Sequence, residues 1–135
     1  MSNMQAPYQY RHIDPLVLFD VVQDMDAFRH ISGIYLETAP PMHERLQKAV
    51  LANDRVAIAH AAHSLRGSTS LIGANQLSQL LRDMERLARA EESGPDPVPA
   101  QEMTELFDKV MEEVKISIIH FQGILKSNCK TLSQK

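Results

Sequence analysis

Apolar positions along this 135-residue chain recur every three or four residues, the period of a helix with one buried face. The pattern is clearest between residues 54 and 72, where a helical wheel at 100° per residue gathers a stripe within about 80°. The stripe consists of Ile58, Ala62, Leu65, Thr69 and Ile72. We therefore predict a helix from Asp54, a favourable N-cap residue, to about Ile72, with this stripe facing the core.

Two helices are predicted before this one. Asp14 followed by Pro15 is typical of an N-cap and a first helical position, so a short apolar helix should begin there and end near Gln23. We expect this short helix to lie across one end of a bundle. The next helix should begin at Asp24 or Asp26, either of which can cap it.

Prolines and glycines divide the middle of the chain. The pair at 40–41 should break or kink the second helix, because proline lacks a backbone donor, and the helical period resumes up to Leu51. Gly73 is predicted to stop the helix over 54–72, and Asn75 to cap the next one. The apolar face of that next helix is Leu77, Leu80, Leu81, Met84, Leu87 and Ala88, and its polar side carries Arg82, Asp83, Glu85 and Arg86.

The last helix follows a linker. Residues 93–99 hold three prolines and a glycine, which cannot form a helix, and we expect a plain connector over one end of the bundle. A final helix is predicted from Ala100 to about Lys126. Its apolar positions are Leu106, Val110, Val114, Ile118, Phe121 and Leu125.

These segments predict an all-α fold: an antiparallel four-helix bundle with a short additional N-terminal helix. We expect residues 1–13 to be a flexible N-terminus, 14–126 the bundle and 127–135 a flexible C-terminal tail. The composition suits this fold, because 44% hydrophobic residues with no tryptophan point to an aliphatic core. The length favours a single domain, and nothing in the sequence requires more than a monomer.

Charge and hydropathy narrow the classes of function. The net charge is −3, with no basic block, which argues against a nucleic acid partner. No apolar run approaches a membrane span, and residues 1–10 lack the apolar core of a signal peptide. We therefore expect a cytoplasmic protein without a membrane partner. Cys129 is the single cysteine and is interpreted as a free thiol without a role.

Chemistry concentrates on the outer face of the helix over 54–72. On the wheel, His63 lies about 140° from the centre of the buried stripe, Arg66 about 80°, Ser70 about 120° and Gly67 about 180°. A glycine within a helix costs about 1 kcal/mol relative to alanine, so Gly67 needs a reason. A close approach by a large partner to the imidazole supplies one. The neighbouring guanidinium indicates that the group transferred is anionic.

The residues around His63 resemble the motif of histidine-containing phosphotransfer (HPt) domains, the phosphocarriers of bacterial-type two-component phosphorelays. The matching positions are His63, Leu65, Arg66, Gly67, Ser68, Gly73 and Ala74. The family usually has lysine in place of Arg66 and often serine in place of Thr69. Both changes keep the charge or hydroxyl character, although arginine and lysine differ in geometry. A weaker resemblance extends over residues 14–125.

The resemblance implies a histidine phosphocarrier. His63 would accept a phosphoryl group from a receiver-domain aspartate of a hybrid sensor histidine kinase and pass it to a response regulator. Arg66 and Ser70 would lie next to the phosphate, and Gly67 would give the partner clearance. No intrinsic cofactor is expected, because a divalent metal such as Mg²⁺ belongs to the receiver. The exposed apolar positions Ile31, Ile34 and Tyr35 are a hypothesis for part of the docking surface.

Several alternatives compete with this interpretation. His60 and His63 are three residues apart and His43 lies on the preceding helix, but no suitable carboxylate or cysteine set accompanies them, so no metal site is expected. The chain has no nucleotide-binding glycine loop, which argues against an autonomous enzyme. It could be the phosphoacceptor module of a larger histidine kinase, although Met1 favours a free-standing protein. It could also be an inhibitory module that binds receivers without being phosphorylated, although the intact His63 argues against this.

Overall fold

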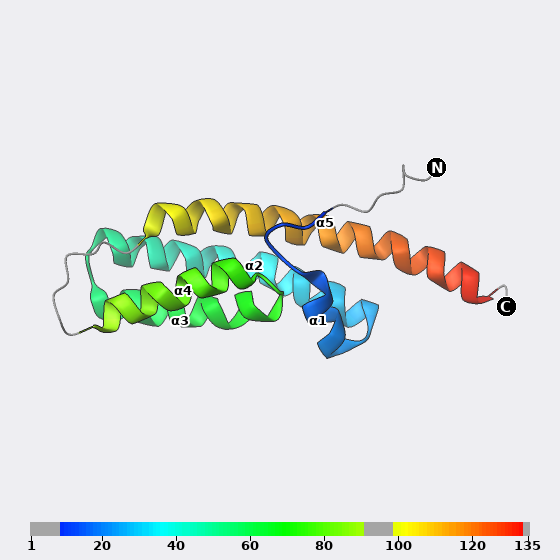
Figure 1. Cartoon of the computed structure of the whole chain (residues 1–135), viewed down its shortest axis with the longest axis horizontal. Coiled ribbons are helices and arrows are strands. Elements are labelled where there is room, and N and C mark those ends of the chain that lie inside the picture. The colour runs from blue at the N-terminus through cyan, green and yellow to red at the C-terminus, as the bar shows by residue number, and fades with distance from the viewer. Residues whose placement is uncertain (1–8, 91–98, 134–135) are drawn as a thin grey trace.

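A computed structural model of the chain describes residues 9–90 and 99–133, and over these residues it is entirely helical (Figure 1). This confirms the predicted all-α fold class. The helices are α1 Pro15–Val22, α2 Met25–Leu51, α3 Arg55–Leu71, α4 Asn75–Arg89 and α5 Ala100–Ser133. In the part of the chain that the structure describes, none of these helices combines the length and the apolar character needed to cross a lipid bilayer.

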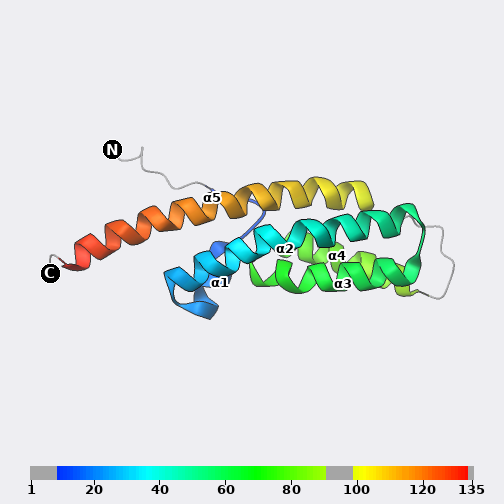
Figure 2. The ribbon, with the colours of Figure 1, turned by 180° about the vertical axis from the view of Figure 1, so that it is seen from behind.

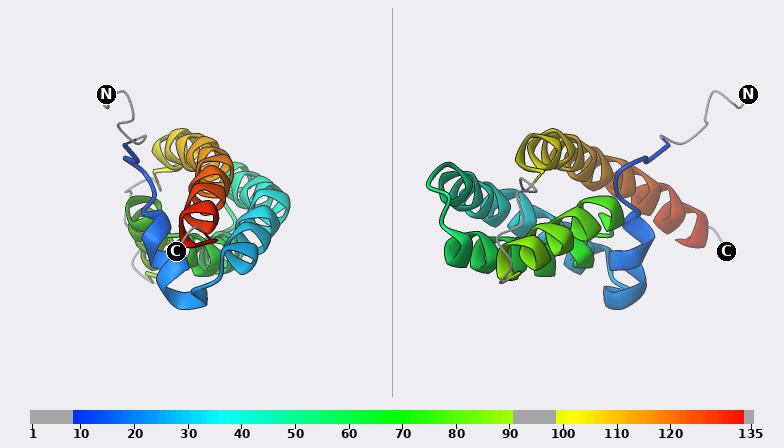
Figure 3. Two further views of the ribbon diagram at one scale, coloured as in Figure 1. Left: turned by 90° about the vertical axis from the view of Figure 1, so that its right-hand side faces the viewer. Right: turned by 60° about the vertical axis from the view of Figure 1, so that its left-hand side comes forward.

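Four long helices form the bundle, and each runs antiparallel to the next along the chain (Figures 1 and 2). Helix α3 packs against α2 and α4, and α5 packs against the same two neighbours, so the four close into a ring. Helix α1 lies across one end of the bundle, where it contacts α2 (Figure 3). Helix α5 continues beyond this end. The short N-terminal helix and the bundle therefore have the predicted arrangement.

The buried stripe of α3 lies where the sequence places it. Its five positions are 0–3% exposed: Ile58, Ala62, Leu65, Thr69 and Ile72. The helix begins as expected, because the Asp54 carboxylate accepts the backbone N–H of Ala57 at 3.1 Å. Asp14 caps α1 in the same way, and Asp24, rather than Asp26, caps α2. Local capping and a regular apolar period are thus enough to define these helix starts.

The predicted break at Pro40 and Pro41 is wrong, because α2 is one helix from Met25 to Leu51 with both prolines inside it. The two prolines are exposed, whereas Ala39 and His43 on either side of them are buried. Both halves of α2 therefore pack against the same core. This packing holds the helical course despite the backbone donors that proline removes.

A tight turn joins α3 to α4. The N–H of Gly73 donates to Ser70 O and that of Ala74 to Thr69 O, which is the hydrogen-bond pattern of a Schellman motif. Gly73 has φ +84°, and a Cβ there would lie 2.2 Å from the backbone oxygen of Asp14. Glycine is therefore required at this stop, as predicted. The prediction of Asn75 as N-cap is wrong, since Ala74 takes that position without a side-chain cap.

A buried carboxylate on α5 holds the segment that precedes α1. Glu113 is 3% exposed, and its oxygens accept the backbone N–H groups of Arg11 (3.1 Å), His12 (2.8 Å) and Ile13 (3.1 Å). The expectation of a loosely packed N-terminus over 1–13 therefore fails for these three residues. They are fixed by a partner about a hundred positions away in the sequence, which no local pattern reveals.

The C-terminal helix is longer than predicted. Helix α5 continues past the expected end at Lys126 to Ser133, into the segment predicted to be a flexible tail. No proline or glycine follows Gly123, so a polar sequence alone did not end the helix. The linker predicted over 93–99 falls almost wholly outside the described residues.

The Glu113 contacts predict an acid-dependent stability. Burial raises the pKa of Glu113, but the N–H groups of His12 and Arg11 outweigh burial and hold the pKa below its usual range. A lowered folded-state pKa adds stability above the unfolded value of about 4.3, and this stability is lost as pH falls through the folded-state pKa. We expect Glu113→Gln to be about 1–3 kcal/mol less stable than wild type at pH 7, with a smaller difference at pH 3. Urea unfolding at both pH values measures this, and an equal difference at the two would contradict it.

Candidate functional site

His63 stands on the outer face of α3, with 60% of its side chain exposed. The buried stripe of α3 faces the opposite way, toward the core. The position predicted from the wheel is therefore confirmed: the imidazole is open to a partner. Gly67, one turn further along the helix, is also exposed, and a Cβ there would meet nothing within 4 Å.

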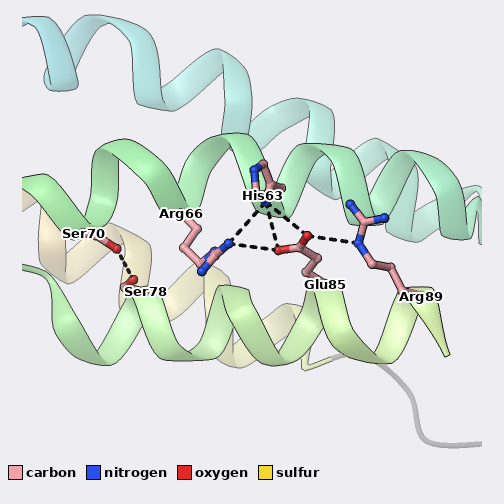
Figure 4. Close-up of polar contacts among 6 residues, drawn as sticks. All are labelled: His63, Arg66, Ser70, Ser78, Glu85 and Arg89. Carbon is pink, nitrogen blue, oxygen red and sulfur yellow. Dashed lines mark hydrogen bonds and ion pairs between the residues drawn. The ribbon is translucent and has the colours of Figure 1, made fainter.

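A carboxylate on α4 contacts one ring nitrogen of His63 (Figure 4). Nδ1 lies 3.2 Å from Oε1 of Glu85 and 3.1 Å from Oε2. An ionised carboxylate only accepts hydrogen bonds, so Nδ1 must carry the proton to make this contact. The neutral ring then has its lone pair on Nε2. Glu85 thereby selects the tautomer whose second nitrogen is a nucleophile.

Two arginines flank the same carboxylate. Nη2 of Arg66 lies 3.5 Å from Oε1 of Glu85, and Nε of Arg89 lies 3.0 Å from Oε2 (Figure 4). Arg66 Nη2 is also 3.3 Å from Nδ1 of His63, but a protonated Nδ1 cannot accept its hydrogen. The favourable partner of Arg66 in this arrangement is therefore Glu85. The guanidinium lies one helical turn from His63, as predicted.

The electrostatics keep Glu85 ionised. Its side chain is only 14% exposed, and this burial raises the pKa. The hydrogen bonds with His63 and Arg89 act more strongly in the opposite direction, so the pKa of Glu85 lies below that of an ordinary glutamate. The carboxylate is therefore negative at neutral pH and can balance a positive charge on the imidazole.

Ser70 is on the same helix, but its hydroxyl is directed elsewhere. It is hydrogen-bonded to the hydroxyl of Ser78 on α4, at the end of the helix pair near the turn (Figure 4). Seven residues separate Ser70 from His63, which is about 10 Å along a helix. The structure therefore brings Arg66 and Glu85 to His63, and pairs Ser70 with Ser78 instead.

Two other side chains differ from what the sequence suggests. Tyr35, expected to contribute to the docking surface, is 2% exposed, and its hydroxyl is 2.9 Å from Thr69 Oγ1 in the core. The expectation is wrong because α2 turns this residue inward, whereas Ile34 remains 42% exposed. His43 is also buried: its ring stacks on Phe107 with centroids 4.2 Å apart. It packs in the core and does not join His60 and His63.

Sequence reasoning missed Glu85 and Arg89. Glu85 was placed on the polar side of α4, which identifies it as outside the core but does not pair it with any residue. The turn contains the missing signal. Ser70 and Ser78 are each four residues from Ala74, and His63 and Glu85 are each eleven residues from it. In an antiparallel helix pair centred on that turn, residues equally far from it face each other, so the first contact predicts the second.

Comparison with known proteins defines the class. The family model for the Hpt domain matches residues 30–115, which include α3, α4 and the whole site. The chain therefore belongs to the Hpt domain family. This membership gives it a role in histidine phosphotransfer within phosphorelays.

A solved structure agrees with this family. The chain is similar to histidine-containing phosphotransfer protein B (HptB) from Pseudomonas aeruginosa PAO1, with 26% sequence identity and a TM-score of 0.69. The match covers 82% of this chain and 96% of the HptB chain. No curated protein matches the sequence.

The open space at Gly67 generates a test with a matched control. Gly67→Ala should fold and gain up to about 1 kcal/mol of stability, because nothing surrounds the new methyl group. We expect phosphotransfer to slow about ten- to a hundredfold, since a displaced partner loses its alignment with His63. Gly33→Ala, on α2, also adds a methyl group in open space and should leave transfer unchanged. Equal transfer rates for the two variants, measured by rapid quench, would refute this role of Gly67.

Proposed function

We propose that this protein is a phosphocarrier of a multistep phosphorelay. His63 accepts a phosphoryl group from the aspartyl phosphate of a receiver domain in a hybrid sensor kinase and delivers it to the receiver of a response regulator. The observation that supports this proposal most strongly is the contact of Glu85 with Nδ1, which leaves Nε2 unprotonated on an exposed ring. The chain supplies the carrier histidine and no kinase activity of its own.

The chemistry follows from the tautomer. The Nε2 lone pair attacks the phosphorus, the P–O bond to the aspartate breaks, and its electron pair stays on the aspartate carboxylate. The ring becomes a phosphoimidazolium that keeps its proton on Nδ1, where the negative Glu85 balances the charge. No proton has to enter or leave. The same steps in reverse return the phosphoryl group to an aspartate, which suits a reversible carrier.

Arg66 is proposed to neutralise the phosphoryl oxygens. Its guanidinium lies beside His63 and presents several N–H donors to an anion. The divalent metal of this chemistry, with Mg²⁺ as the expected ion, is assigned to the acidic site of the receiver. We keep Gly67 as the clearance residue. Ser70 would have to leave Ser78 to reach the phosphate, so we give its hydroxyl a place in packing α3 against α4.

The receiver is proposed to dock over the groove between α2 and α3. This groove adjoins His63 on the side opposite Glu85 and is lined by Met42, Arg45, Ala57, His60, Ala61 and Ser64. Ile34 lies exposed on α2 and extends the apolar part of this surface. A mixed, shallow surface of this kind suits a transient complex.

Replacement of the carrier histidine tests the proposal directly. A phosphorylated receiver should label the wild-type protein with acid-labile, base-stable phosphate, and His63→Gln should abolish the label without loss of helicity. His60→Gln, an exposed histidine one turn away on α3, is the matched control and should retain it. Radiolabel transfer and circular dichroism measure the two properties. Labelling of the His63→Gln variant would contradict the proposal, and a wild-type protein that binds receivers but is never labelled would support an inhibitory module instead.

The role of Glu85 can be tested separately. Glu85→Gln keeps the size of the side chain but removes the charge that stabilises the phosphoimidazolium. We expect transfer to slow about tenfold, which corresponds to the difference of about 1.4 kcal/mol between charged and neutral acceptors. Asp83→Asn removes a carboxylate on α4 that pairs with Arg86, and serves as the control. Transfer at the wild-type rate in Glu85→Gln would show that the carboxylate charge is dispensable.

A further inference from the structure

The Glu85 carboxylate is held from two sides by cations on different helices. Arg66 of α3 approaches Oε1, and Arg89 of α4 approaches Oε2 (Figure 4). The two contacts are unequal, because the Arg66 distance is 3.5 Å and the Arg89 distance is 3.0 Å. The shorter contact comes from the residue on the far side of Glu85 from Arg66. This asymmetry gives the two arginines different tasks.

Arg66 has hydrogen-bonding capacity that the unphosphorylated site does not use. Its side chain is 25% exposed, and its Nε is buried without a hydrogen-bond partner within the described part of the chain. A phosphoryl group on His63 would bring a charge of about −2 and three acceptor oxygens to this guanidinium. Such an anion competes strongly with a carboxylate that is 3.5 Å away. Phosphorylation should therefore draw Arg66 from Glu85.

Once Arg66 leaves, Glu85 depends on its other cation. Without one, the negative carboxylate would face a phosphoryl group of the same sign and could turn away from His63. Arg89 remains in reach, because it sits one turn after Glu85 on α4 and contacts the oxygen that Arg66 does not. Its side chain is 57% exposed, so the contribution of this ion pair is modest.

We propose that Arg89 is a positioning residue that keeps the Glu85 carboxylate on Nδ1 of His63 while Arg66 binds the phosphoryl group. This inference rests on the proposed function. Its consequence concerns the onward step, in which the acceptor carboxylate attacks phosphorus, the P–Nε2 bond breaks and the electron pair returns to Nε2. With the proton retained on Nδ1, the ring leaves as neutral imidazole. If Glu85 turned away, this proton would be exposed to solvent.

The experiment compares Arg89→Gln with wild type in both phosphorylation states. Histidine-¹⁵N protein is phosphorylated with phosphoramidate, from which ammonia leaves as the P–N bond breaks, so no cognate receiver is needed. Coupling between ³¹P and ¹⁵N identifies the phosphorylated nitrogen. The measured quantity is the solvent exchange rate of the Nδ1 proton of His63. In the phosphorylated protein we expect exchange about two- to fivefold faster in Arg89→Gln than in wild type. In the unphosphorylated protein the rates should agree, because Arg66 still holds Glu85.

Matched variants separate this role from a general effect on α4. Arg89→Lys keeps the cation and should restore the slow exchange. Arg86→Gln removes a neighbouring arginine that pairs with Asp83, and should change neither state. Equal exchange in Arg89→Gln and wild type after phosphorylation, or an equal increase in both states, would overturn the inference. Either result leaves the proposed function intact, since that depends on labelling of His63 by a receiver.

Discussion

The contact between Glu85 and Nδ1 of His63 is the interaction on which the site depends. An exposed histidine is a common surface residue, and its two nitrogens are equivalent to solvent until one of them is committed. Here a carboxylate that is 14% exposed and held by two arginines commits Nδ1 to donating a hydrogen bond. The other nitrogen is then the nucleophile. The same negative charge stabilises the ring when it becomes positive, so a single contact serves attack and release.

The bundle fixes that contact through the turn between α3 and α4. Gly73 allows the chain to pass within hydrogen-bonding distance of Asp14, whose N–H donates to Gly73 O at 2.9 Å. The turn sets the register of the two helices, and the register places Glu85 opposite His63. Glu113 holds the segment leading into Asp14 from the other side of the bundle. The N-terminal segment and α5 thus support the turn on which the site is built.

The parts of the fold that sequence predicts well are those with local causes. The buried stripe of α3, the caps at Asp14 and Asp54 and the stop at Gly73 each depend on residues close together in the chain. The continuity of α2 through its prolines was mispredicted because burial on both sides overrides a local rule. Tyr35 was misplaced for a related reason, since periodicity alone did not show which face of α2 meets α3.

The site was predictable only in part, and for the same physical reason. Arg66 and Gly67 lie within one turn of His63, so a wheel of α3 finds them. Glu85 and Arg89 belong to another helix, and their importance comes from a register that the wheel of either helix does not contain. A polar residue on the outside of a helix is ordinarily solvated. Only the pairing of α3 with α4 distinguishes Glu85 from its polar neighbours.

The most direct measurement is the ring tautomer of unphosphorylated His63, read from the ¹⁵N shifts and proton couplings of a histidine-labelled sample at neutral pH. The account predicts that the neutral ring carries its proton on Nδ1 and that Nε2 is unprotonated. A His63 ring protonated on Nε2, with Nδ1 free, would contradict the account, because the exposed nitrogen would then have no lone pair to attack phosphorus.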